Sequence, residues 1–132
     1  MSKKADQVQM DALNNRWTAT NAPGLGVTCV ASSGAPRAGA GGRMYCDGLL
    51  WSANNGKGAA AATFTGSLRD ASIGGNVLQS FEVVVPAATS LQDAYYLSTP
   101  GINGNALVFE FGTPNASVSQ RGTIVGWQED FR

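Results

Sequence analysis

The stretch Val77-Leu78-Gln79-Ser80-Phe81-Glu82-Val83-Val84-Val85-Pro86 decides the fold class. Its apolar side chains recur with the period of two residues that a β-strand has, and not with the helical period of about 3.6 residues. The alternation puts Val77, Phe81, Val83 and Val85 on one face, and Leu78, Ser80, Glu82 and Val84 on the other. Because Pro86 has no amide hydrogen, it ends the strand or marks a sheet edge.

Six more β-prone runs lie on either side of this stretch and are separated by turn residues. They are Gly24–Ser32, Arg43–Trp51, Ala59–Leu68, Asp93–Leu97, Asn105–Phe111 and Arg121–Trp127. In the last two, alternation turns Leu107, Phe109 and Phe111 inward, and places Thr123, Val125 and Trp127 on one face. The signal Asn54-Asn55-Gly56 predicts a tight hairpin turn, because Asn-Gly supplies the positive φ that such turns require.

The seven runs predict an all-β domain. With about seven short strands and no helix pattern after residue 20, we expect an antiparallel two-sheet sandwich with jelly-roll-like connections. Residues 1–22 differ in character, since they hold charges and a thin apolar stripe. We therefore expect an N-terminal arm over 1–22, helical near 5–15 or extended, and a β-sandwich domain over 23–132.

Charge and composition exclude several classes of function. Nine basic and nine acidic residues give a formal net charge of zero, and there is no basic cluster, which argues against electrostatic binding of nucleic acid. The absence of histidine excludes a Ser-His-Asp triad, a Cys-His dyad and a histidine-ligated zinc site. No apolar run is long enough to span a membrane or to follow Lys3-Lys4 as part of a signal peptide, so we expect synthesis in a cytosol. We expect no cofactor and no metal.

Two pairs of residues have both a structural and a functional interpretation. Cys29 and Cys46 lie in apolar segments and are expected to be small buried residues, although the spacing leaves a disulfide open. Glu82 and Glu110 lie in the middle of strands, where paired carboxylates would suit a glycosidase. We prefer the interpretation that the two glutamates face solvent and keep the strands soluble. We expect no enzyme.

Aromatic residues give an alternative function. Trp51, Tyr95, Tyr96 and Trp127 would suit a platform that stacks on sugar rings, with nearby asparagines binding hydroxyl groups. This alternative is a carbohydrate-binding module or a tail-fibre-like adhesin domain. The competing interpretation makes Trp51 and Trp127 core or interface residues.

The two ends of the chain are the expected partner-binding parts, because a marginal segment with apolar residues becomes ordered when it docks. The candidate residues are Val8, Met10, Leu13 and Trp17 near the N-terminus and Trp127, Phe131 and Arg132 near the C-terminus.

A polar arm (Ser2–Leu13) leads into a compact β domain that is rich in Ala, Gly, Ser, Thr and Asn and nearly free of charge. In this organisation, across the whole chain, the sequence resembles capsid decoration or cement proteins of bacteriophages. The resemblance implies a non-enzymatic virion protein on the capsid exterior, made in the host cytoplasm. It also implies a homotrimer that binds the major capsid protein and no membrane. No diagnostic motif is matched, so the resemblance assigns no functional residue.

Overall fold

The computed structural model describes residues 16–21, 24–25, 30–33, 42–56, 60–72, 74–102, 104–111 and 118–129, which form nine β-strands and no helix. The strands are β1 (Arg16–Thr20), β2 (Gly24–Leu25), β3 (Val30–Ser32), β4 (Arg43–Asn55), β5 (Ala62–Asp70), β6 (Val77–Val85), β7 (Ser90–Pro100), β8 (Leu107–Phe111) and β9 (Val118–Glu129). Nothing in this part of the chain is a helix able to cross a lipid bilayer.

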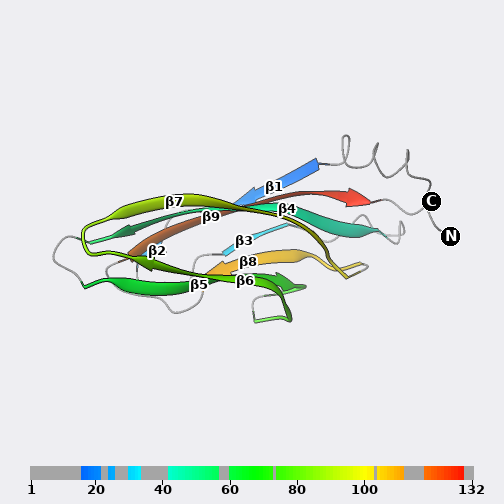
Figure 1. Ribbon diagram of the computed structural model, residues 1–132. Coiled ribbons are helices and arrows are strands. Elements are labelled where there is room, and N and C mark those ends of the chain that lie inside the picture. The colour runs from blue at the N-terminus through cyan, green and yellow to red at the C-terminus, as the bar shows by residue number, and fades with distance from the viewer. Residues whose placement is uncertain are drawn as a thin grey trace.

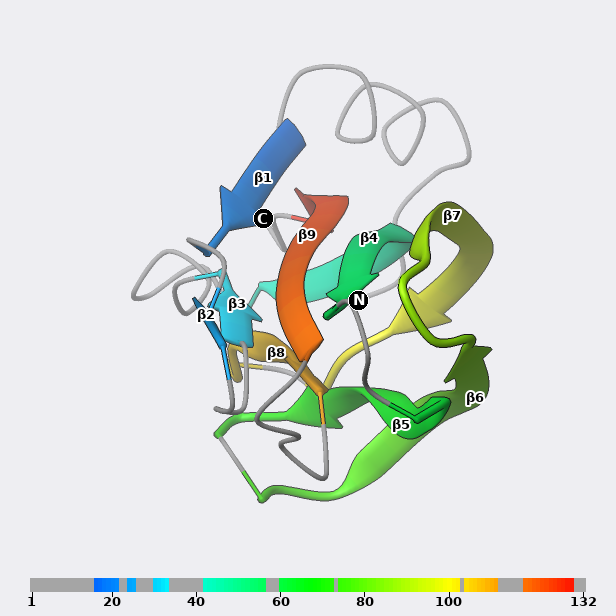
Figure 2. The ribbon, with the colours of Figure 1, turned by 90° about the vertical axis from the view of Figure 1, so that its left-hand side faces the viewer.

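The strands form two sheets that lie face to face (Figure 1). The first sheet has the order β1-β9-β4-β7, with β2 also pairing with β9, and the second has the order β3-β8-β5-β6. All pairings are antiparallel. Seen along the strands in Figure 2, β7 and β6 lie at one side of the sandwich and β1, β2 and β3 at the other. The architecture is a β-sandwich.

The strand order is that of a jelly roll. Strands from the two halves of the chain pair as β1 with β9, β3 with β8, β4 with β7 and β5 with β6, and successive pairs alternate between the sheets. The prediction of an all-β, two-sheet antiparallel sandwich with jelly-roll-like connections is confirmed.

Two short elements account for the difference between seven expected strands and nine observed ones. The expected run over 24–32 is divided into β2 and β3, which pair in different sheets. Residues 16–20, which the sequence assigns to the arm, form β1 and pair with β9. The expected helix near 5–15 lies outside the described residues.

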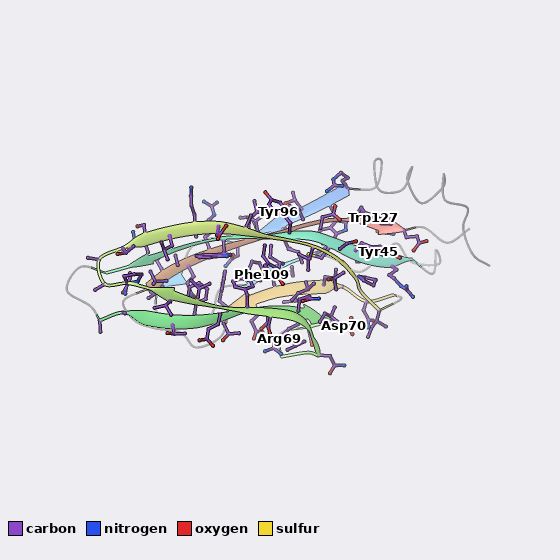
Figure 3. The ribbon with its side chains drawn as sticks, viewed as in Figure 1. Tyr45, Arg69, Asp70, Tyr96, Phe109 and Trp127 are labelled. Atoms are coloured by element: carbon purple, nitrogen blue, oxygen red, sulfur yellow. The ribbon has the colours of Figure 1, made fainter. Side chains whose placement is uncertain are left out.

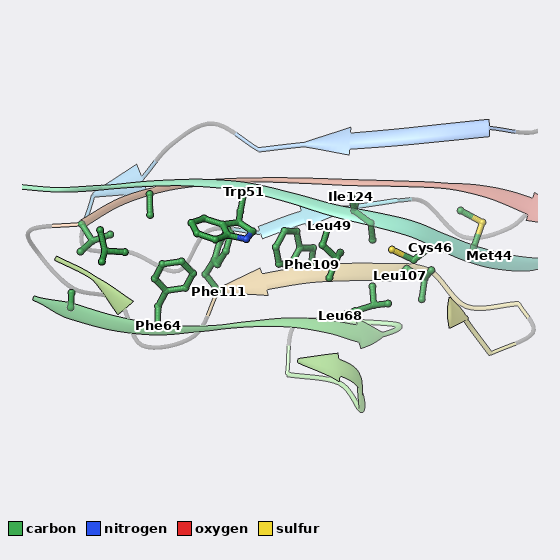
Figure 4. Packing of buried hydrophobic residues seen from close by; sticks show 14 residues of the cluster. Met44, Cys46, Leu49, Trp51, Phe64, Leu68, Leu107, Phe109, Phe111 and Ile124 are labelled. Carbon is green, nitrogen blue, oxygen red and sulfur yellow. The ribbon is translucent and has the colours of Figure 1, made fainter. Parts of the chain in front are cut away.

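The core lies between the sheets and is centred on aromatic side chains (Figure 4). Phe64 and Phe111 meet edge to face with ring centroids 5.2 Å apart, and Trp51 meets Phe64 in the same way at 5.6 Å. Phe109 packs on Phe111 with centroids 4.7 Å apart. Such pairs add specific geometry to the free energy gained by burying apolar surface.

One face assignment made from the sequence is wrong, and a β-bulge explains it. The pairing of β5 with β6 shifts register between Leu68 and Arg69, so Gln79 opposes Leu68 but Val77 opposes Arg69. The extra residue, Leu78, turns inward and packs against the core, while Val77 is 50% exposed. A bulge reverses the alternation beyond it, which period-two reasoning does not anticipate.

The expected tight hairpin at Asn54-Asn55-Gly56 is also wrong. Strand β4 continues through Asn55, and the chain then crosses to β5 in the other sheet. The side-chain amide of the buried Asn55 donates to the backbone oxygens of Ala60, Val85 and Pro86 at 2.9, 3.1 and 3.2 Å. The asparagine therefore joins the crossing segment to the end of β6.

Candidate functional site

The candidate site is the outer face of the first sheet, which is the face directed away from the second sheet. Alternation along the strands and their register arrange its residues in rows across β9, β4 and β7. The rows are Ser119, Asn54 and Ser90; Arg121, Ser52 and Gln92; Thr123, Leu50 and Ala94; and Val125, Gly48 and Tyr96. Short hydroxyl and amide side chains dominate the first two rows, and apolar ones the last.

A depression follows these rows. One hollow of about 420 Å³ is lined by Leu50, Trp51, Ser52, Gln92, Asp93, Ala94, Arg121 and Thr123. An adjoining hollow of about 490 Å³ is lined by Ser52, Ala53, Asn54, Ser90, Leu91, Gln92, Ser119 and Arg121. They share Ser52, Gln92 and Arg121, so we describe them as one trough. Each volume lies in the range of small-molecule sites.

Arg121 supplies the positive charge of the trough. Its side chain is exposed, and within the described part of the chain it forms no ion pair. Asp93, the acidic residue along the trough, follows Gln92 on β7 and opposes the inward-facing Trp51 in the register. Its Oδ1 accepts a hydrogen bond from the amide of Ala94 at 2.7 Å. The guanidinium therefore remains available to a ligand.

An aromatic side chain lies beyond one end of the trough. Tyr96 is 79% exposed and lies directly across from Gly48 in the register. A β-carbon at Gly48 would be 3.7 Å from the Tyr96 ring, 3.7 Å from Leu50 and 3.2 Å from Val125. The glycine thus lets these three side chains gather into an apolar patch, in which Leu50 is 37% exposed.

Trp127, a predicted partner-binding residue, lies on this outer face beside Tyr45 (Figure 3). The two rings stack with centroids 4.2 Å apart and an interplanar angle of 2°, which leaves Trp127 8% exposed. The Tyr45 hydroxyl donates to Glu129 Oε2 at 2.9 Å, and burial, together with this carboxylate, raises the pKa of Tyr45. The stacked rings of Tyr45 and Trp127 therefore pack together where β4 begins and β9 ends.

Trp17, another predicted partner-binding residue, faces the inside of the sandwich. Its half-buried side chain packs against the core, over Gly126, where a β-carbon would clash with the indole and with the Tyr45 carbonyl. Strand β1 is therefore held to the sandwich by Trp17 as well as by its pairing with β9. The other candidates, Val8, Met10, Leu13, Phe131 and Arg132, lie outside the described residues.

The expected aromatic platform is not assembled, because its residues lie on different surfaces. Trp51 is buried in the core against Phe64 and Phe81, and Tyr95 packs on Phe81 with centroids 5.6 Å apart. Tyr96 and Trp127 share the outer face. Alternation in β7 sends adjacent Tyr95 and Tyr96 to opposite sides of the sheet. The same alternation puts the side chains of the trough on one face of each of β4, β7 and β9, and the pairing of these strands then brings them together.

Cys46 is a buried free thiol, as expected, and Cys29 lies outside the described residues. Burial raises the pKa of Cys46 to about 12, and its Sγ–H donates to the carbonyl of Gly48 at 3.6 Å. A thiol kept protonated is a poor nucleophile and a poor metal ligand. No group of residues suited to hold a metal ion occurs in the described ranges.

Glu110 is not the solvent-facing residue expected from the sequence. It is 9% exposed, its Oε1 lies 3.3 Å from Arg69 Nε, and its Oε2 accepts from the Gly74 amide at 3.1 Å. Arg69 also donates to the Gly75 carbonyl at 2.7 Å. Glu82 is exposed on β6, on the other side of β5. Glu110 therefore secures the turn between β5 and β6, and the two carboxylates do not converge.

No family model and no curated protein matches this chain. One similar solved structure comes from Bacillus endospore appendages, which are described as a family of disulfide-linked pili. It is 10% identical in sequence with a TM-score of 0.36, over 100% of this chain and 98% of that chain. At this TM-score the likeness carries no argument about fold or function.

Proposed function

We propose that this chain is a non-enzymatic structural protein of a virion, which decorates a phage capsid and stabilises it through contacts between subunits. The observation that supports this function best is the free edge of β7. This strand has 11 residues and pairs with β4, and no other described strand pairs with it. The edge therefore presents backbone amides and carbonyls to another chain.

The composition of β7 suits pairing between chains. Exposed edges are usually protected by lysines, prolines or bulges that prevent a second strand from adding. In β7 the one charged residue is Asp93, and the one proline, Pro100, comes last; the register shift against β4 falls after Tyr96, so the edge carries no lysine, proline or bulge from Ser90 to Tyr96. Tyr96 is largely exposed beside this edge. A strand of a neighbouring subunit would gain main-chain hydrogen bonds there, together with apolar contact.

We propose a homotrimer as the assembled form. The formal net charge of zero opposes self-association only weakly. In a three-fold ring, β7 of each subunit would meet a different surface of the next subunit, whereas β7 paired with itself would give a two-fold dimer. The two arrangements differ in mass, so light scattering distinguishes them.

We propose that the two ends of the chain contact the major capsid protein. Trp17 packs against the core and Trp127 stacks on Tyr45 on the outer face, so we assign both a structural part. Val8, Met10, Leu13, Phe131 and Arg132 remain the proposed capsid-binding residues. Jelly-roll domains are frequent in viral capsids, which supports the proposal by analogy of fold alone.

The proposal is tested by asking whether the chain is part of a particle. Phage particles from a host that expresses a tagged copy are banded in a density gradient, and the tag is measured across the gradient. We expect the full chain to band with the particles. A chain lacking residues 1–15, which retains β1, should remain at the top. If the full chain stays at the top, the virion proposal is wrong; if the truncated chain bands equally, the arm is not the contact.

The alternative function, carbohydrate binding, is favoured by one observation of its own. The trough on the outer face gathers hydroxyl, amide and guanidinium groups in a shallow site beside an exposed tyrosine. The platform of tryptophans and tyrosines first expected for this function plays no part in it.

A further inference from the structure

We propose that the trough binds an acidic oligosaccharide, with Arg121 pairing with a sugar carboxylate. This site uses neither the β7 backbone edge nor the two ends of the chain, and it shares only the side chain of Tyr96 with the proposed subunit contact. Three observations support it: the shape of the trough, the chemistry of its lining, and the single available cation in its middle row.

The shape suits an extended chain of sugars. Taken together, the trough and the ring of Tyr96 beyond it extend from the row of Asn54 to the row of Gly48, over which β4 advances six residues, or about 20 Å at the usual rise of a strand. Three strands span the width at about 4.8 Å each. The site is thus longer than it is wide and lies open on a flat sheet. A short oligosaccharide can lie along it, whereas a compact monosaccharide would occupy one part.

The lining suits hydroxyl groups. Ser52, Gln92 and Ser119 present side chains that both donate and accept hydrogen bonds, as sugar hydroxyls do. The Asn54 amide donates to Ser90 Oγ at 2.8 Å, which orients both side chains at one end of the trough. Beyond the other end, the exposed ring of Tyr96 can stack on the apolar face of a pyranose.

The positive charge of Arg121 favours a sugar that carries a carboxylate. Arg121 lies in the row between Asn54 and Leu50, half-way along the trough and on its β9 side. Its planar guanidinium can donate two parallel hydrogen bonds to a carboxylate, which is a stronger interaction than hydrogen bonds between neutral groups. The Asp93 carboxylate is directed to the other side of β7 and is bound to the Ala94 amide. An anion near Arg121 therefore meets little opposing charge.

Isothermal titration calorimetry of the full chain tests the proposal with two acidic probes, a hyaluronan tetrasaccharide and a tetragalacturonate. Chitotetraose serves as the neutral probe. We expect at least one acidic probe to bind, about tenfold more tightly than chitotetraose and more weakly as salt is raised. Arg121→Gln should weaken that binding about tenfold, and Tyr96→Ala should also weaken it. Both side chains are exposed, so the thermal unfolding of the variants should match that of the parent.

Arg16→Gln is the matched control. Arg16 lies on the same face outside the trough and forms an exposed ion pair with Asp47 at 2.7 Å. Its loss should leave sugar binding unchanged. The proposal is overturned if neither acidic probe binds at millimolar concentration, if chitotetraose binds equally, or if Arg121→Gln binds like the parent. It is also overturned if a glutamate-rich peptide of equal charge binds as tightly as the sugars, since the site would then recognise acidic protein segments.

Discussion

At the scale of single residues, several side chains act differently from what their type suggests. Glu110, a charged residue in a strand, is buried and holds a turn through Arg69 and Gly74. Asn55 is buried at the end of β4 and joins three backbone carbonyls from two other segments. The sequence could not reveal these roles. Each one depends on partner residues that are distant in the sequence and come close only when the strands pair.

Cys46 makes stability depend on pH above neutrality. Its pKa is raised by burial from 9.0 to about 12, so the unfolded chain releases the thiol proton at a lower pH than the folded chain does. The stabilisation is complete below pH 9.0 and is lost as the pH rises toward 12, by at most about 1.4 kcal/mol per pH unit. Urea unfolding between pH 7.5 and 10 should show the decline.

Cys46→Ala is the control for this dependence. It should have lower stability at pH 7.5, because it leaves a small cavity, and a shallower decline at higher pH. The raised pKa of Tyr45 acts in the same direction in both proteins and cancels in the comparison. Equal declines in the two proteins would contradict a buried, protonated thiol.

At the scale of elements, period-two alternation predicted most strands and the inward face of β8, and it grouped Thr123, Val125 and Trp127 on one face of β9, which is the outer face of the first sheet. It did not predict where alternation breaks. The bulge in β6 exchanges Val77 and Leu78 between the faces, and a second irregularity between Cys46 and Gly48 interrupts β4. Nor did it predict β1, because Arg16–Thr20 alternates only weakly and is held by β9 and Trp17. Local patterns do not encode such long-range pairing.

The β6 bulge gives a paired test. Leu78→Ser should destabilise the protein by about 2 kcal/mol, because Leu78 packs against the core and serine would place a polar group there. Val77→Ser should change the free energy of unfolding by less than about 0.5 kcal/mol, because Val77 is half exposed. Both are measured by urea unfolding. The reverse order would mean that strict alternation, without the bulge, describes this strand.

At the scale of the whole molecule, the jelly-roll order leaves β7 at one end of the first sheet. The sequence predicted the sandwich. Its lack of histidine also excluded a Ser-His-Asp triad, a Cys-His dyad and a histidine-ligated zinc site. It did not predict the strand order, and hence neither the free edge nor the trough, since both arise where β4, β7 and β9 lie side by side. The same sheet thus offers an edge for another subunit and a face for a small ligand.

Assembly through the β7 edge is measured by light scattering on a sizing column. We expect three chains of 13.6 kDa, about 41 kDa in all, for the parent. Ser98→Lys places a charge on the exposed edge and should shift the mass to that of a monomer. Thr63→Lys, exposed on β5 away from that edge, should leave the oligomer intact. A monomeric parent, or an unchanged oligomer in Ser98→Lys, would contradict the account.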